Sequence, residues 1–258
     1  YYLPIIKNLI KIIFSTNKFF KIKSTDFTTN SRILLRDLLS TSIKNGLEVF
    51  TDNELKSIQS KDGQIIAECN NKKITGRKIV ICVGGNLEKF TNTKIKKSLA
   101  PIAVVKNVPS DTESFVELDY FKKTCINIIT KGSSYGLIGG ISLSNKKELD
   151  KYFKYMISEH KKNNPNMEVL QKYVGIKNEI ISRGENRNYI FHINQEEENE
   201  NIWSIIPGKF SLAFSIAPEF YRLVYKKNPK KFFETHEDEK NKDIIEETIW
   251  ENIQNKVS

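Results

Sequence analysis

The chain has 258 residues, of which 39% are hydrophobic and 28% charged, proportions typical of a folded globular protein rather than a disordered one. Its 41 Lys and Arg against 31 Asp and Glu give a formal net charge of +10, which an anionic partner could explain. The basic residues are mostly lysines scattered along the chain, without the stacking aromatic motif of an RNA-binding domain, so we expect no nucleic-acid partner. No apolar run is long enough to span a membrane, so we expect no transmembrane segment.

The cysteines and histidines argue against disulfide and metal sites. Cys69, Cys82 and Cys125 are odd in number and widely spaced, which predicts neither a disulfide framework nor a zinc site and favours a reducing compartment, the cytoplasm. The three histidines form no HxH or HxxxH pair, so we expect no metal ion.

The first elements in chain order are expected to be two helices. Residues 2–15 have apolar side chains at helical spacing, which indicates packing on a core and leaves peripheral membrane contact open. A second helix is expected over 32–45, because residues 29–31 can cap it and Gly46 can end it.

After Gly46 the apolar spacing changes to a period of two, which predicts short strands. The apolar run 78–84 predicts a central strand buried on both faces, and its glycines would allow close approach to the backbone. The short strands that precede it are expected at 47–50, 54–58, 64–68 and 72–75.

From residue 95 onward, runs rich in β-branched residues predict an antiparallel sheet with helices on one side. Later elements are strands at 189–193 and 202–206, a buried helix over 210–226, a charged linker over 234–243 and a final helix over 244–256. The antiparallel sheet is expected to contain strands at 100–107, 114–118, 125–130 and 136–142, with helices at 146–162 and 167–173.

Three segments, residues 31–58, 72–86 and 201–220, resemble in this order the D-amino-acid oxidase and glycine oxidase superfamily of FAD-dependent oxidoreductases. Residues 31–58 resemble the family's helix, glycine turn and adenine-contacting strand. Residues 72–86 are similar to its strand ending in V-V-x-A-x-G, and residues 201–220 to its glycine-containing strand-to-helix junction ending in Ala-Pro.

This resemblance implies an FAD cofactor. A reduced flavin carries negative charge near N1 and O2, and the helix start after Gly208, with Lys209, would stabilise that charge. The cofactor-binding positions that the resemblance implies are Leu55, Val83, Gly84, Gly85, Gly208, Lys209, Phe210, Ser211, Leu212, Ala213 and Phe214.

The resemblance also implies a substrate side. Lys177 stands where family members often have an Arg that binds a substrate carboxylate. Arg183, Arg187 and His192 follow, and they either bind a carboxylate or phosphate, with His192 as base or orienter, or form a solvated turn.

The expected fold class is mixed, α/β with α+β character, a Rossmann-like FAD-binding portion interleaved with an antiparallel-sheet substrate domain. The family's GxGxxG βαβ unit is absent, so we expect a longer parent protein and weak FAD binding by this fragment alone. The expected boundaries are 1–95 for the first part of the FAD-binding domain, 96–193 for the substrate domain, 194–230 for the return to the FAD-binding domain, and 231–258 for a C-terminal linker and helix.

The function predicted from these features is oxidation of a C–N or C–O bond in a small, anionic substrate. An alternative is a basic binding protein that keeps the fold without cofactor or catalysis. The sequence leaves the oligomeric state open.

Overall fold

A computed structural model describes residues 22–23, 28–119, 122–132, 134–180, 192–197, 199–230 and 234–257. The chain divides into two compact units, Tyr1–Ser31 and Arg32–Ser258, and the architecture below is that of the second. The helix expected over 2–15 lies outside the described residues.

The largest sheet has five antiparallel strands in the order β6-β7-β8-β5-β9. Helix α3 (Leu149–Asn163) packs on one face, where Met156 and Phe153 meet Ala103 and Val105 in a buried core. The strands are β5 (Ile95–Lys106), β6 (Phe115–Asp119), β7 (Thr124–Lys131), β8 (Tyr135–Gly140) and β9 (Glu168–Ile180).

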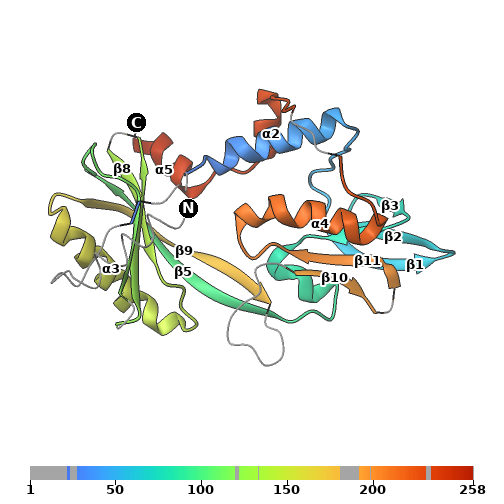
Figure 1. Cartoon of the computed structure of the whole chain (residues 1–258), viewed down its shortest axis with the longest axis horizontal. Helices are drawn as coiled ribbons and strands as arrows, with labels where there is room; N and C mark the ends of the chain where they lie inside the picture. Colours follow the sequence, from blue (N-terminus) through green and yellow to red (C-terminus); the bar gives the residue numbers. More distant parts are fainter. Residues whose placement is uncertain are drawn as a thin grey trace, which may run out of the picture. The chain divides into compact units, whose positions relative to one another are not determined.

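Strands β5 and β9 extend beyond the rest of this sheet and form a two-stranded arm (Figure 1). They pair from Lys106↔Glu168 to Ile95↔Ile180, whereas β8 pairs only with the Lys106 end of β5. The helix expected over 167–173 is therefore wrong. From Glu168 onward these residues belong to β9 and their backbone groups pair with β5. This tertiary interaction overrides the weak local preference for helix.

A second sheet has the order β10-β11-β4, with β10 (His192–Glu196) antiparallel and β4 (Ile79–Ile81) parallel to β11 (Asn199–Ile206). Among the described strands, β4 lies at the edge of this sheet, so its prediction as a central strand over 78–84 is wrong in position and length. Its chain leaves the sheet at Cys82 and enters a 3-10 helix, η1 (Gly84–Lys89).

The helix expected over 210–226 is present as the 3-10 turn η3 (Phe210–Leu212) and the helix α4 (Ala213–Tyr225). The prediction that this helix is buried is wrong for most of its side chains. Ile216 is its one buried side chain among the described residues, whereas Phe214 remains 53% exposed.

A small antiparallel sheet, β1-β2-β3, precedes these elements. Helix α2 (Ser31–Lys44) forms as expected, but residues 47–50 form no strand. The C-terminal elements are η4 (Glu239–Ile244), which lies mostly in the linker expected over 234–243, and α5 (Ile249–Val257), which begins five residues later than the helix expected over 244–256. The small sheet consists of β1 (Leu55–Lys61), β2 (Gln64–Cys69) and β3 (Lys73–Gly76). The mixed α+β class with antiparallel sheets is thus confirmed.

Candidate functional site

The candidate site lies where two parallel strands end. In the pairing of β4 with β11, Ile79 lies opposite Ile202 and Ile81 opposite Ser204, so both carboxyl ends reach the same edge. Each strand is soon followed by a glycine in the left-handed region, Gly84 at φ 54° and Gly208 at φ 48°. Glycines at such turns allow another group, whether a ligand or a neighbouring side chain, to approach the backbone closely.

The helix that begins after Gly208 presents an uncapped N-terminus. The side chains of Lys209 and Leu212, which hold the N-cap positions of η3 and α4, make no capping hydrogen bond, and neither first turn contains an acidic residue. The N–H groups of a helix start carry partial positive charge, and the exposed Lys209 adds a formal one. This end of the helix therefore favours negative charge.

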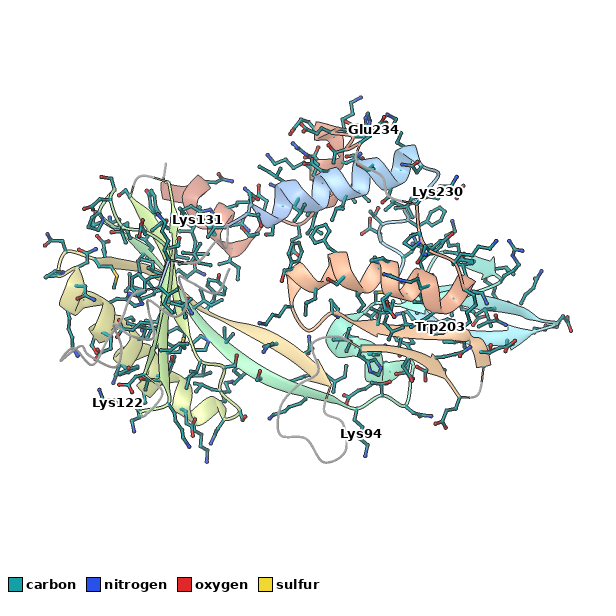
Figure 2. The ribbon with its side chains drawn as sticks, in the orientation of Figure 1. Lys94, Lys122, Lys131, Trp203, Lys230 and Glu234 are labelled. Atoms are coloured by element: carbon teal, nitrogen blue, oxygen red, sulfur yellow. The ribbon has the colours of Figure 1, made fainter. Side chains whose placement is uncertain are left out.

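Helix α4 is held on β11 by an aromatic contact. Trp203 packs edge-on against Phe220, with ring centroids 5.6 Å apart, and Trp203 lies under α4 in Figure 2. On the opposite face of β11, Ile206 packs with Ile81 and Leu87 in a small core. The strand thus fixes the start of the helix relative to the η1 turn.

The arm of the large sheet reaches this turn through Asn178 on β9. A Cβ atom placed on Gly85 would lie 2.5 Å from Asn178 Oδ1, and one on Gly84 would lie 3.7 Å from Asn178 Nδ2. Asn178 Oδ1 is buried and has no hydrogen-bond partner among the described residues. An orphaned acceptor costs free energy, so it marks a place where a donor would be stabilising.

The opposite face of the arm carries Lys177. Residues paired across an antiparallel ladder share a face, so Lys177 shares one with its partner Ser98, and Tyr173 lies two pairs along the same face. This face is turned away from α3, because Lys172, at the alternate position, lies over the ring of Phe153 in that helix. Ser98 is buried, with its Oγ unpartnered among the described residues, and burial raises the pKa of Tyr173.

His192 lies at the start of β10, directly opposite Ile206 and thus close to the Gly208 turn. Burial lowers the pKa of His192, and the negative charge of Glu196 acts against that shift. The imidazole is therefore neutral at pH 7, and its Nε2 is buried without a partner in the described part of the chain.

The structure therefore brings Val83, Gly84 and Gly85 to one sheet edge with Gly208 and the start of α4. Leu55 is the partly buried first residue of β1. Arg183 and Arg187 lie outside the described residues.

The sequence alone did not identify three polar residues that lie near these positions, Ser98, Tyr173 and Asn178. The last two flank Lys177 in the chain, but nothing in their type or spacing signals a role. Only the pairing of β5 with β9 and the approach of Asn178 to Gly85 reveal them.

No group of three or more His, Cys, Asp or Glu residues that could hold a metal ion occurs in the described ranges. The helices that the structure describes are all too short or too polar to cross a membrane.

Two solved structures resemble this fold. Iminodiacetate oxidase from Chelativorans sp. has a TM-score of 0.52 at 10% sequence identity, over 74% of this chain and 53% of its own. Glycine oxidase from Geobacillus kaustophilus has a TM-score of 0.51 at 13% identity, over 73% of this chain and 52% of its own. The chain thus spans about half the length of each, and it has the mixed α+β fold of these oxidases. No family model and no curated protein sequence matches the chain.

Proposed function

We propose that this chain is part of an FAD-dependent oxidoreductase. The observation that carries the proposal is the common edge of β4 and β11, where Gly84 and Gly208 turn with positive φ beside an uncapped helix start. The likeness of the fold to two oxidases supports it. The parts proposed are the FAD-binding segments 1–95 and 194–230, the substrate domain 96–193 and the C-terminal segment 231–258.

The residues at this edge fit a flavin nucleotide. The backbone at Val83, Gly84 and Gly85 would lie along the cofactor, and Leu55 would contact the adenine. The N–H groups at the start of the helix from Phe210 through Phe214, with the charge of Lys209, would stabilise negative charge on the ring system. Bound FAD would supply the hydride acceptor.

The substrate side consists of the Lys177 face of the arm and the start of β10. Lys177 would bind the anionic group of a small substrate as a point charge, with Arg183 and Arg187 as further candidates. The neutral His192 would accept the proton that the substrate's amine or hydroxyl group loses, or orient that group. The substrate would thus lose a hydride from a C–N or C–O carbon. We further propose a cytoplasmic location, since the free thiols Cys69, Cys82 and Cys125 suit a reducing compartment.

The test is flavin binding by the protein in its full natural length. We expect the purified protein to show flavin absorbance, or to acquire it when FAD is added. Gly208→Ala should weaken FAD binding about tenfold or more, because Gly208 has positive φ at the proposed cofactor edge and an alanine strains the backbone there.

Gly132→Ala is the matched control, since Gly132 also has positive φ, at 63°, and lies between β7 and β8, outside the proposed cofactor edge. The control should bind FAD normally. A folded full-length protein that ignores added FAD would refute the proposal and favour the alternative, a non-catalytic binding protein.

A further inference from the structure

The C-terminal residues 234–257, here called the C-terminal strap, contact two distant parts of the chain. The first half of the strap is rich in Glu, Asp and Lys, a composition that by itself predicts a solvated linker. In the structure it runs beside α2, and its final helix, α5, lies beside β8 (Figure 1). Specific contacts must therefore order it.

The first anchor is centred on Arg36 of α2. Its side chain is only 8% exposed, and the guanidinium is paired with Asp37 at 2.7 Å, with Glu237 at 3.6 Å and with Glu239. Glu237 and Glu239 belong to the strap. A buried guanidinium requires such partners, so release of the strap would leave Arg36 with Asp37 alone among them.

Hydrogen bonds extend this anchor along one side of α2. Arg32 donates to the carbonyl oxygens of Ile245 and Lys242, at 3.1 and 3.2 Å. Asn241 Nδ2 donates to Ser40 Oγ at 2.9 Å. Arg32, Arg36 and Ser40 are spaced four residues apart and so lie on one face of the helix, which makes that face a continuous polar dock for the strap.

The second anchor is on the five-stranded sheet. The ring of Trp250 in α5 packs edge-on against Tyr135 of β8 at 5.5 Å, and Ile253 is 6% exposed. Tyr135 alternates with Gly136 and Ile138, and Ile138 belongs to the core under α3. Helix α5 therefore covers the sheet face opposite α3.

The link between the anchors is short and ordered. Thr248 and Glu251 form a capping box at the start of α5, with Glu251 accepting from the Thr248 N–H at 2.9 Å and Thr248 Oγ1 accepting from the Glu251 N–H at 3.2 Å. Only two residues separate Ile245, which accepts from Arg32, from this cap. The segment between the two anchors is therefore too short to absorb a displacement of either one.

We propose that the C-terminal strap is an intramolecular clamp that ties α2 to the five-stranded sheet and docks or releases as one unit. It therefore sets the position of the sheet that carries Lys177 and Asn178. This inference does not depend on flavin binding, since it rests on the contacts of the strap alone.

The experiment compares native-state hydrogen exchange in the full natural protein and two variants. Arg36→Met removes the guanidinium but keeps the length of the side chain. We expect exchange to become about tenfold faster or more in residues 234–248, and also in α5 and β8, because the strap loses its charge-assisted hydrogen bond to the guanidinium and the clamp transmits the release. Arg222→Met is the control, because Arg222 is an exposed arginine whose partner Glu219 lies on the same helix.

Trp250→Ala tests the reverse direction and does not disturb the charge cluster. It should speed exchange in α5 by about tenfold or more, and in residues 234–248 and α2 as well. Faster exchange confined to the altered anchor in both variants would overturn the clamp, as would unchanged exchange of the strap in Arg36→Met.

Discussion

Asn178 on β9 lies against Gly85, the second glycine after β4, so closely that a Cβ on Gly85 would stand 2.5 Å from Asn178 Oδ1 and 3.0 Å from its Cγ. The contact joins the arm of the five-stranded sheet to the η1 turn. Gly85 has no positive φ, so its glycine identity follows from the space that Asn178 occupies rather than from backbone strain.

Gly85→Ala should therefore destabilise the protein by about 1–2 kcal/mol, since overpacking forces the buried amide to move. In the double variant Gly85→Ala with Asn178→Ala, the loss should be smaller than the sum of the two single losses, because the second change removes the obstructing atoms. Urea unfolding of the four proteins measures this. Additive losses would show that the contact is loose enough to relax.

A second prediction concerns Gly140 at the end of β8. A Cβ there would stand 1.9 Å from the Tyr152 hydroxyl oxygen and 2.4 Å from the Cys125 carbonyl oxygen. Gly140→Ala should cost about 3 kcal/mol or more, because a backbone atom cannot be moved cheaply.

Tyr152→Phe should cost about 1–3 kcal/mol. The hydroxyl donates to the Cys125 carbonyl at 2.7 Å and accepts from the Ile141 N–H at 2.8 Å, so its removal leaves both groups unpaired. Thermal and urea unfolding measure both variants. Tyr155→Phe on the same helix is the control, and it should change stability by less than 0.5 kcal/mol, about the limit for positions without such contacts.

Much of the fold follows from local pattern. Helix α2 ends at Lys44, just before the expected Gly46 turn, whose φ of 96° suits glycine. The hairpin turn at Asp62 and Gly63 also forms, because this pair tolerates the positive φ it requires. The runs rich in β-branched residues form the strands of the large sheet, because such side chains pack well on a pleated surface.

What could not be predicted depends on tertiary contact. Residues 167–173 joined β9 because β5 offered a pairing partner that spacing does not reveal. The outer face of α4 stays exposed, since β11 packs against only one side of the helix, where Trp203 meets Phe220. Asn178 reaches Gly85 across nearly a hundred positions of sequence, and only the folded arm shows it.

The acid dependence of stability should include a contribution from His160. This residue of α3 is 5% exposed, and burial lowers its pKa from the ordinary 6.5 more than its hydrogen bond to the backbone of Asn127 raises it. The unfolded chain therefore binds the proton more readily than the folded one, so the stabilisation is present above about pH 6.5 and is lost as the pH falls below it.

His160→Gln should reduce the slope of unfolding free energy against pH between about 6.5 and 5, by at most about 1.4 kcal/mol per pH unit. Urea unfolding at several pH values measures it. His192 shifts in the same direction and leaves a residual slope. A slope identical to that of the unaltered protein would show that His160 protonates without penalty.

The last prediction concerns anion binding by Lys177, and it rests on the proposed function. Lys177 lies on the arm face turned away from α3, beside the buried Ser98, whereas Lys172 lies on the opposite face over the ring of Phe153. The two lysines share a strand and a charge and differ in the face they occupy.

A charge-assisted hydrogen bond contributes about 1.5–3 kcal/mol, so Lys177→Gln should weaken binding of small carboxylates, from acetate to benzoate, by roughly 10- to 150-fold. Titration of the full-length flavin-loaded protein, followed by the flavin absorbance, gives the dissociation constants.

Lys172→Gln should leave the dissociation constants within about twofold of those of the unaltered protein. Lys177→Arg should keep most of the affinity, since the positive charge is kept. Equal weakening by both Gln variants would mean that net charge, rather than a site at Lys177, attracts the anion.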